Sequence, residues 1–300
     1  MKIIYLLIVH KNFDQVFRVI ERLNIPDSHF LIHVDQKVKS ATFQHVVKVL
    51  SSKPNIIYMD RQNVTWGAIG LTQVMCDAFA LLIQRRFDFN FLVILSGQDY
   101  PIKTNDHIFA TLCQYQGKQF IEQFPIPRDG WGIDSGRDRY ERYHFRLRNY
   151  HFCYPPISYS NKKYGFLRDL LPHERRTIPG NLSPHGGSAL FTLSKTGVEF
   201  LVDYFSTPFG KRLFSFFRTV NLPEEVIFQT VLVNSDLKDT LINDNLQYID
   251  WEAYGQHPSI MTTEYFDALR KSEALFSRKF DITVDSKILD QIDHYLLCIR

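Results

Sequence analysis

Cysteine is scarce in this 300-residue sequence and follows no pattern. The four cysteines are widely separated and include no C-x-x-C pair: Cys76, Cys113, Cys153 and Cys298. This scatter argues against a zinc site and against a disulfide framework. A reducing compartment is therefore the default expectation. Hydrophobic residues make up 45% of the chain, which is enough to build a substantial core without disulfides.

Long apolar runs and strong net charge are also missing. The N-terminal run Ile3–Val9 is far shorter than the roughly 20 residues that a membrane span requires, and no small-residue cleavage site follows it. We expect this run to be the first strand of a cytoplasmic protein, and peripheral contact with the inner membrane is compatible with that expectation. The net charge of +3 is too mild to indicate a nucleic-acid partner.

Two nucleotide-binding signatures are absent as well. No G-x-G-x-x-G follows the first apolar run, where Val9-His10-Lys11-Asn12 stands instead, and the chain contains no Walker sequence. A dinucleotide dehydrogenase and a P-loop kinase are therefore disfavoured. A nucleotide site of another kind remains open.

Apolar runs alternate with amphipathic segments over the first third of the chain. The predicted strands are Lys2–Val9, Phe30–Val34, Asn55–Met59 and Phe91–Leu95. The predicted helices between them are Phe13–Leu23, with Asn12 as its cap, Phe43–Leu50 and Ala68–Gln84. This order is typical of an α/β fold with a mostly parallel central sheet flanked by helices.

Polar residues stand at the carboxyl ends of two predicted strands. Asp35 ends the second strand, and Ser96, Gln98 and Asp99 follow the fourth in a turn marked by Gly97 and Pro101. In open α/β sheets, ligands bind beyond these ends. The alternatives are that Asp35 is a solvated strand end and that Asp99 satisfies backbone N–H groups in an ordinary turn. At this point both interpretations stay open.

The rest of the chain carries shorter signals. Helices are predicted near Asp106–Gln114 and at Lys195–Phe205, Val226–Val233 and Ser286–Leu297, strands at Lys118–Glu122 and Tyr248–Trp251, and a long loop from Pro155 to Pro184. Gly186 and Gly187 directly precede an apolar run, which suggests close backbone approach to a ligand or a strained turn. Pro223, Glu224 and Glu225 suit a helix start, so capping is an alternative to any chemical role for both glutamates.

The segment Arg128–Tyr154 combines arginines with aromatic residues. Its arginines are Arg128, Arg137, Arg139, Arg142, Arg146 and Arg148. Such a mixture suits phosphate pairing and base stacking in nucleic-acid binding. It equally suits a sugar ring lying on an aromatic face, or an ordinary solvated helix.

Eight stretches in this order are more specific together than any one of them. They are Leu31–Asp35, Val64–Gly67, Leu95–Thr104, Gly186–Ala189, Pro223–Glu225, Tyr248–Trp251, His257–Pro258 and Leu275–Asp281. Together they resemble the core-2/I-branching enzymes, glycosyltransferase family 14, which include β-1,6-N-acetylglucosaminyltransferases and peptide O-xylosyltransferases. The likeness runs from Lys2 to about Leu297, and the sequence is similar to the compact bacterial form of the family.

The resemblance implies a fold and a reaction. The fold is the GT-A type of nucleotide-diphosphosugar transferase, here one domain over residues 1–300, with a nucleotide-binding half at about 1–115 and an acceptor and catalytic half at about 116–300. The reaction is inverting transfer of a sugar from a UDP donor to a hydroxyl. Most GT-A enzymes bind the diphosphate through a metal held by an Asp-x-Asp motif, whereas this family uses basic side chains. This sequence contains no Asp-x-Asp, so we expect no metal and no cofactor.

The resemblance also assigns roles to individual residues. Glu225 matches the general base, and Glu224 before it would cap the helix or lie against the acceptor. Lys279 matches the phosphate-binding lysine, with Arg278 beside it. The uridine end would lie at Val9, Asp35 and Trp66. The donor and acceptor sugars would lie along Asp99, Glu122, Gly187 and Ser188.

One position departs from the family pattern. The second phosphate-binding cation of the family is an arginine that aligns with Gln247. Arg278 or an arginine of the segment Arg128–Tyr154 would then have to supply the charge. A hydrogen bond to a charged group is worth roughly 1.5–3 kcal/mol, so an uncompensated loss would weaken diphosphate binding.

We therefore expect an inverting, metal-independent glycosyltransferase. The favoured donor is UDP-N-acetylglucosamine, forming a β-1,6 branch on a glycan or a lipid-linked saccharide, and no nucleic-acid partner is expected. UDP-xylose is the alternative donor. The alternative from another class is a non-catalytic sugar- or polyanion-binding module that uses the arginine and aromatic segment.

Overall fold

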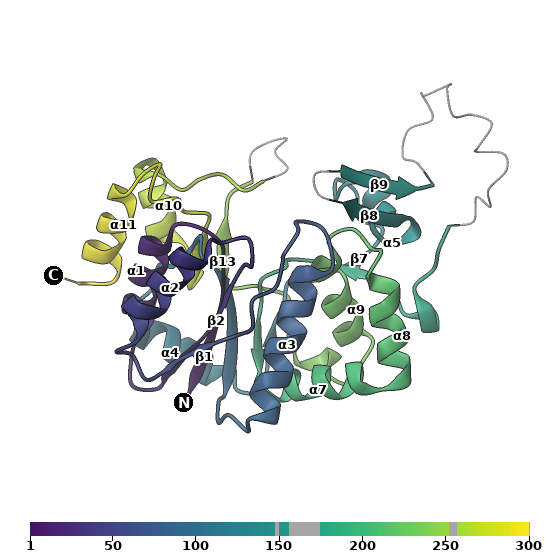
Figure 1. Cartoon of the computed structure of the whole chain (residues 1–300), viewed down its shortest axis with the longest axis horizontal. Coiled ribbons are helices and arrows are strands. Elements are labelled where there is room, and N and C mark those ends of the chain that lie inside the picture. The colour runs from purple at the N-terminus through teal and green to yellow at the C-terminus, as the bar shows by residue number, and fades with distance from the viewer. Residues whose placement is uncertain (148–149, 156–174, 252–256, 300) are drawn as a thin grey trace.

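The computed structural model describes residues 1–147, 150–155, 175–251 and 257–299. A seven-stranded sheet forms its centre, with helices on both faces (Figure 1). Across the sheet the strands are β12 (Leu241–Ile242), β6 (Gln119–Phe120), β11 (Thr192–Ser194), β4 (Phe91–Ser96), β1 (Ile3–Val9), β2 (Ser28–Val34) and β3 (Ile56–Tyr58). Strands β1 to β4 pair in parallel, and β11 is antiparallel to both of its neighbours. The predicted parallel arrangement of the first third of the chain is confirmed.

Buried side chains alternate between the two faces of the central strands. On β1, Tyr5 and Leu7 belong to one hydrophobic core, and Ile4 and Leu6 belong to the other. This alternation explains why the strand is a continuous apolar run, because parallel strands covered on both faces must be apolar throughout.

Each core is closed by its own group of helices (Figure 1). The first face is covered by α1 (Phe13–Leu23), α2 (Ser40–Leu50), α4 (Asn105–Gln114), α10 (Phe266–Lys271) and α11 (Lys287–Gln291), which a π-helical turn (Ile292–Leu296) extends. The second face is covered by α3 (Gly70–Gln84), α7 (Lys195–Ser206), α8 (Pro208–Phe217) and α9 (Ile227–Val233). No helix in the described part of the chain is both long enough and apolar enough to cross a bilayer.

A smaller sheet joins the end of the chain to the turn after β4. Its strands are β13 (Gln247–Ile249), β14 (Phe276–Arg278) and β5 (Asp99–Pro101). Strand β14 is parallel to β13 and antiparallel to β5, with Arg278 opposite Asp99. The antiparallel pairing therefore brings a basic residue of the last strand against an acidic residue at the carboxyl edge of the main sheet.

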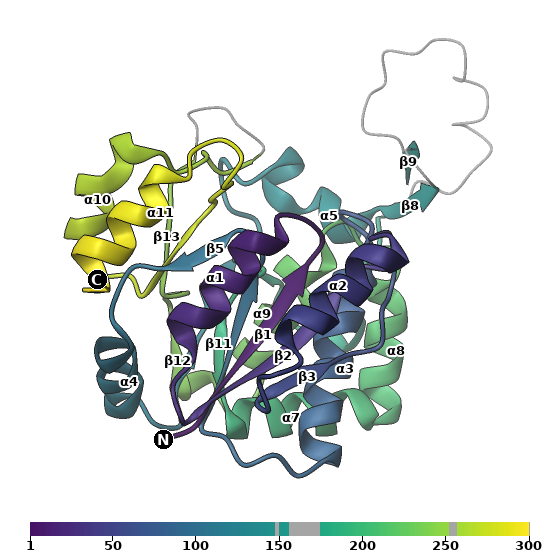
Figure 2. The same ribbon diagram turned by 60° about the vertical axis from the view of Figure 1, so that its left-hand side comes forward.

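Two pairs of antiparallel strands complete the fold. Strands β7 (Phe124–Pro125) and β10 (His185–Gly186) pair antiparallel, and so do β8 (Tyr143–Leu147) and β9 (Tyr150–Tyr154). The β8–β9 hairpin lies with the short helix α5 (Asp138–Glu141) at the end toward which the parallel strands run (Figures 1 and 2). The solvated helix considered for this segment is therefore not what the structure shows over its second half.

Several sequence-based expectations need correction. Asn12 does not cap α1: its φ of 53° is left-handed, and its side chain donates to Asp281 at 2.8 Å instead. Helix α8 was not predicted, and α3 begins at Gly70 rather than Ala68. The long loop predicted from Pro155 to Pro184 falls largely on residues 156–174, which lie outside the described residues.

Candidate active site

Glu225 lies in a short 3₁₀ turn, Pro223–Glu225, directly before α9. Its backbone carbonyl accepts a hydrogen bond from Gly187 N–H at 2.9 Å. Its carboxylate oxygen Oε2 lies 2.5 Å from a guanidinium nitrogen of Arg139, and its side chain is 24% exposed. Burial raises the pKa of Glu225, and the charge and hydrogen bond of Arg139 oppose that rise. Glu225 is therefore a partly accessible carboxylate with one oxygen held by a cation.

Glu224 is buried beside it. Its Oε2 atom finds no hydrogen-bond partner among the described residues. Burial, and then the neighbouring charge of Glu225, raise the pKa of Glu224 to about 8. At neutral pH this carboxyl is therefore mainly protonated.

Arg139 and Trp131 are site residues to which the sequence analysis gave no individual role. The Arg139 guanidinium lies over the Trp131 ring at 3.8 Å from the ring centroid, and its side chain is only 11% exposed. Trp131 in turn packs edge to face on Phe124, with ring centroids 4.9 Å apart. The signal for this pair was the arginine and aromatic composition of the segment, but composition alone does not say which arginine meets which acid.

Glu122, Gly187 and Ser188 form the next part of the site. A Cβ atom at Gly187 would lie 1.8 Å from the carbonyl oxygen of Glu122, so only glycine fits here. The close backbone approach expected at this position is therefore to the protein's own chain. Burial raises the pKa of Glu122, while Arg128 and the Ser188 N–H lower it. The charge of Glu122 also raises the pKa of Glu225, so the two carboxyl groups lie close enough to interact electrostatically.

Asp99 and Arg278 form a buried ion pair across β5 and β14. The Arg278 Nε atom lies 3.1 Å from Asp99 Oδ1, although the two atoms lack hydrogen-bond alignment. Asp99 is fully buried, and its Oδ2 accepts from the Ser96 N–H. Burial raises the pKa of Asp99, and Arg278 opposes the rise. Arg278 also lowers the pKa of Glu225, so its charge reaches the site.

Lys279 follows Arg278 directly. Its backbone N–H donates to the Ser259 carbonyl at 3.4 Å, and its own carbonyl accepts from Met261 at 2.9 Å. Lys279 is a half-buried residue, and no carboxylate of the described residues lies within ion-pair distance of its ammonium group. Within the part of the chain that the structure describes, Lys279 is thus held by its backbone and carries an uncompensated charge.

At the predicted uridine end, Asp35 is 4% exposed, so its interpretation as a solvated strand end is wrong. Its oxygens accept from the backbone N–H groups of Lys37 at 2.8 Å and Val64 at 3.3 Å. Val9 has a buried side chain, and its carbonyl accepts from Asp35 N–H at 2.9 Å. Neither residue offers a free side-chain group, and their role at the uridine end stays a prediction.

Trp66, which the resemblance assigns to the uridine end, is 56% exposed. The Arg146 guanidinium lies 5.0 Å from the centre of a Trp66 ring and donates to Asn221 Oδ1 at 2.7 Å. The charge of Arg146 also lowers the pKa of Glu224. Through Arg146, strand β8 therefore connects the Trp66 loop to the segment that carries Glu224 and Glu225.

The position that departs from the family pattern contains an amide whose oxygen is unsatisfied. Gln247 lies on β13 opposite Phe276, and its Oε1 atom is buried without a hydrogen-bond partner among the described residues. Arg278 is two residues along the neighbouring strand, opposite Ile249. The nearest basic strand position to Gln247 is therefore one that already faces Asp99.

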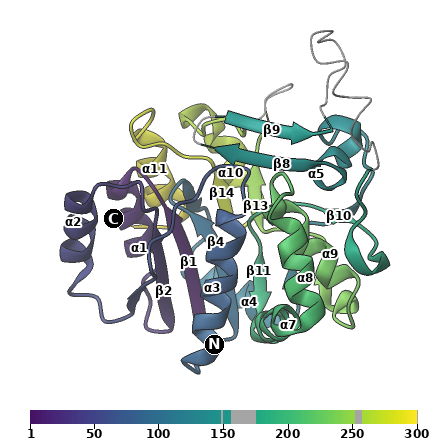
Figure 3. The ribbon, with the colours of Figure 1, turned by 45° about the vertical axis from the view of Figure 1, so that its right-hand side comes forward.

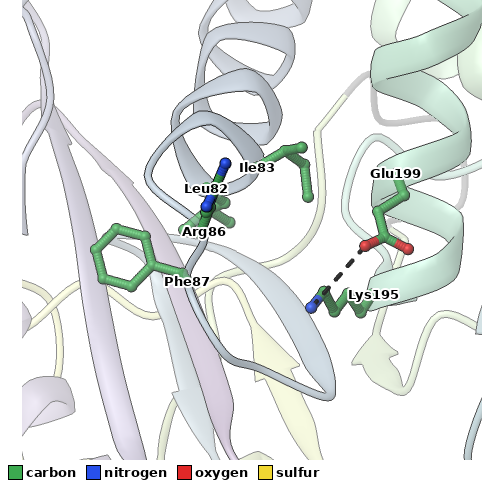
Figure 4. A pocket seen from close by; sticks show the side chains of 6 residues that line it. All are labelled: Leu82, Ile83, Arg86, Phe87, Lys195 and Glu199. Atoms are coloured by element: carbon green, nitrogen blue, oxygen red, sulfur yellow. Dashed lines mark ion pairs between the residues drawn. The ribbon is translucent and has the colours of Figure 1, made fainter.

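A hollow of about 260 Å³ lies away from these residues, at the amino ends of the strands (Figure 4). It is bounded by Leu82 and Ile83 at the end of α3, by Arg86 and Phe87 just beyond that helix, and by Lys195 and Glu199 of α7, which form an ion pair at 3.9 Å. It contains none of the predicted site residues. In the described ranges, no group of three His, Cys, Asp or Glu side chains is arranged to hold a metal ion.

A sequence model described as Core-2/I-Branching enzyme matches residues 3–270. The chain belongs to the Core-2/I-branching enzyme family. Membership confirms the resemblance identified from the sequence. Together with the sheet topology, it also confirms the α/β fold class expected for these glycosyltransferases.

Two curated proteins that the chain resembles are xylosyltransferases. The chain is 27% identical to xylosyltransferase 2 of Rattus norvegicus, over 98% of this chain and 34% of the relative. It is 25% identical to xylosyltransferase 1 of Homo sapiens, over 98% of this chain and 30% of the relative. The chain thus spans about a third of the length of these curated relatives.

Two solved structures align with this chain at low similarity. Mouse xyloside xylosyltransferase 1 in its apo form aligns over 92% of this chain and 97% of its own, with 10% identity and a TM-score of 0.40. Staphylococcus aureus TarS aligns over 50% and 26%, with 15% identity and a TM-score of 0.30. At these scores neither likeness adds to what family membership shows. The roles assigned to single residues of this Core-2/I-branching family member stay predictions.

Proposed function

We propose that this protein is an inverting glycosyltransferase that moves a sugar from a UDP donor to a hydroxyl of a glycan or lipid-linked acceptor. The observation that carries the proposal is the Glu225 carboxylate, partly exposed and held by Arg139 in the Pro223–Glu225 turn. In the proposed step the acceptor oxygen bonds to the anomeric carbon of the donor as the bond from that carbon to UDP breaks. Glu225 takes the acceptor proton, and the electron pair leaves with UDP.

The charge that develops on departing UDP needs a fixed cation. Lys279 supports this part of the proposal, since no carboxylate of the described residues neutralises its ammonium group. Arg278 adds positive potential, but it also faces Asp99 at 3.1 Å. We therefore assign the principal phosphate contact to Lys279.

We further propose that the reaction proceeds without a metal. Two observations on the protein's own donor groups support this part: the sequence has no Asp-x-Asp, and the described residues contain no cluster of three metal-ligating side chains. The diphosphate would then be bound by basic side chains alone.

For the donor sugar, two candidates compete. The sequence-based expectation is N-acetylglucosamine, transferred in β-1,6 linkage. The curated relatives are named xylosyltransferases, which favours xylose as the second candidate. The contacts of the described residues do not separate the two sugars.

A polyanion-binding module is the alternative from another class, and the structure weakens its basis. Arg139 pairs with Glu225, Arg142 pairs with Asp134, and Arg146 donates to Asn221. Three of the arginines that would contact a polyanion are thus engaged within the protein.

The test is donor hydrolysis by the purified protein with UDP-N-acetylglucosamine, UDP-xylose, UDP-glucose and UDP-galactose, each with and without EDTA. We expect UDP release from one donor, unchanged by EDTA, which would identify the sugar. Release that requires Mn²⁺ would contradict the metal-free mechanism. If no donor is hydrolysed, UDP binding measured by calorimetry separates an enzyme that requires its acceptor from a protein that does not bind UDP.

A further inference from the structure

We propose that Arg139, braced on Trp131, is the positioning residue that fixes the Glu225 carboxylate and keeps it in its charged form. The inference rests on the proposed role of Glu225 as the base. A base must be ionised and must point one oxygen at the acceptor hydroxyl before it can take a proton. The contacts around Glu225 provide for both requirements.

The first contact fixes the side chain. Arg139 holds Oε2 of Glu225 at 2.5 Å, and among the described residues no hydrogen bond is made to Oε1. One oxygen is therefore clamped while the other is left to accept a proton. An ion pair with so little exposure is screened less by water than a surface pair.

The second contact fixes Arg139 itself. Its guanidinium lies 3.8 Å from the Trp131 ring centroid, within the range of a cation–π interaction. The indole has little freedom to move, because a Cβ at Gly136 or at Gly186 would lie 2.3 or 2.4 Å from its ring. Two glycines thus make room for a tryptophan that supports the arginine.

These contacts close into a ring that includes the Glu225 backbone. Gly187 donates to the Glu225 carbonyl at 2.9 Å, and the adjacent Gly186 packs on Trp131. Trp131 carries Arg139, and Arg139 binds the Glu225 side chain. The backbone and the carboxylate of Glu225 are therefore positioned by two segments that pack on each other, Gly186–Gly187 and Trp131–Arg139.

The electrostatic setting shows why the arginine is needed. Burial and the two nearby acids Glu122 and Glu224 disfavour the charged form of Glu225. The positive charges of Arg139 and Arg278 favour it. Within the described ranges, Arg139 is the cation in contact with its carboxylate, and Arg278 is paired with Asp99. Without Arg139, Glu225 would hold its proton to higher pH and would be a weaker candidate for the base.

The test measures the titration of Glu225 directly, by carbon-detected NMR of protein labelled with ¹³C in its glutamate carboxyl groups. The signal that disappears in Glu225→Gln assigns the resonance. We expect Arg139→Gln to raise the titration midpoint of Glu225 by about one pH unit or more, and Arg139→Lys to restore part of the difference. Arg212→Gln is the matched control, because Arg212 also lies over an aromatic ring, Phe209, at 5.7 Å.

A Glu225 midpoint that is the same in Arg139→Gln and the parent protein would overturn the inference. If Arg139→Gln does not fold, Trp131→Phe replaces it, with a smaller shift expected in the same direction and an unchanged midpoint again overturning the inference. Turnover separates the two proposals. Near-normal transfer by Glu225→Gln would refute the proposed base, whereas an inactive Glu225→Gln with an unchanged midpoint in Arg139→Gln would refute only the role of Arg139.

Discussion

Asp35 and Glu225 are both acids beside the carboxyl edge of the sheet, yet their carboxylates are held in opposite ways. Asp35 accepts backbone N–H groups of Lys37 and Val64 with its two oxygens. Glu225 gives one oxygen to Arg139, and the described residues leave the other without a hydrogen bond. The Asp35 carboxylate organises a loop, whereas the Glu225 carboxylate keeps one oxygen for the proton transfer proposed above.

The two neighbouring cations differ in the same manner. Arg278 lies 3.1 Å from the buried Asp99, whereas Lys279 meets no carboxylate of the described residues. For each sign of charge, one residue is committed to the fold and one remains open to a ligand. Motif membership alone would not separate them, because all four residues lie in stretches that resemble the family.

Removing the Glu225 carboxylate should have the largest effect on sugar transfer. We expect Glu225→Gln to reduce transfer by about 10²–10⁴-fold, because the amide cannot accept the acceptor proton. UDP affinity, measured by calorimetry, should change little. Asp35→Asn is the matched variant. It should mainly lower the melting temperature, and a loss of turnover equal to that of Glu225→Gln would contradict the distinction.

Substitutions of Lys279 and Arg278 should separate UDP binding from the stability of the fold. We expect Lys279→Met to weaken UDP binding about 10–100-fold, the loss of one hydrogen bond to a charged group, with little change in melting temperature. Lys287→Met, on the exposed first turn of α11, controls for the lost charge. Equal UDP affinity in the two variants would contradict the assignment of Lys279.

Arg278→Met should instead destabilise the fold. It leaves Asp99 buried without its cation, and breaking a buried pair costs on the order of 3 kcal/mol. Urea denaturation measures this difference in the free energy of unfolding. A variant that unfolds at the same urea concentration as the parent protein would show that Asp99 does not depend on Arg278.

Glu224 offers a smaller and pH-dependent effect. Its pKa in the folded protein is about 8, above the ordinary value of 4.5. The folded state therefore binds a proton that the unfolded state has released, and stability falls as pH rises from about 4.5 to about 8. We expect Glu224→Gln to be as stable as the parent at pH 5 and more stable at pH 9. Melting curves that differ by a constant amount across this range would argue against a buried, protonated Glu224.

The smallest effect on the fold is expected at the outer face of the β8–β9 hairpin. Strands β8 and β9 lie side by side (Figure 3). Phe145 and Phe152 pair across them and are 51% and 57% exposed. Replacing both with Ser should change stability by no more than about 0.5 kcal/mol. His144 on the inner face is buried against the Asp138 carbonyl, so His144→Ala should lower the melting temperature. A raised acceptor KM in the Phe145 and Phe152 variant would support this face as an acceptor wall.

The parallel core could be predicted because its signals are local. Continuous apolar runs of strand length are sufficient to indicate β1, β2 and β4, and amphipathic spacing is sufficient for α1 and α7. The alternation of Tyr143, His144, Phe145 and Arg146 was also present, and it indicates a half-buried strand. The prediction missed β8 because the segment was treated as a cluster of arginines and aromatic residues.

The contacts that define the site could not be derived in this way. Arg139 and Glu225 are separated by 86 positions, and Asn12 and Asp281 by 269. No local pattern indicates which arginine of a basic segment will meet a given acid, or that a residue suited to cap a helix will donate to the far end of the chain. The division into a nucleotide half and an acceptor half also stays a prediction.

The pairing of β14 with β5 has a consequence for how the protein is made. Strand β5 leaves the ribosome well before its partner β14. Contacts between residues so distant along the chain form slowly, because a long loop must close first. Until β14 emerges, Asp99 has no arginine beside it, and the positive charge of Arg278 does not yet act on Glu225. The nascent chain can therefore pair its four parallel strands well before the basic residues proposed to bind the diphosphate are in place.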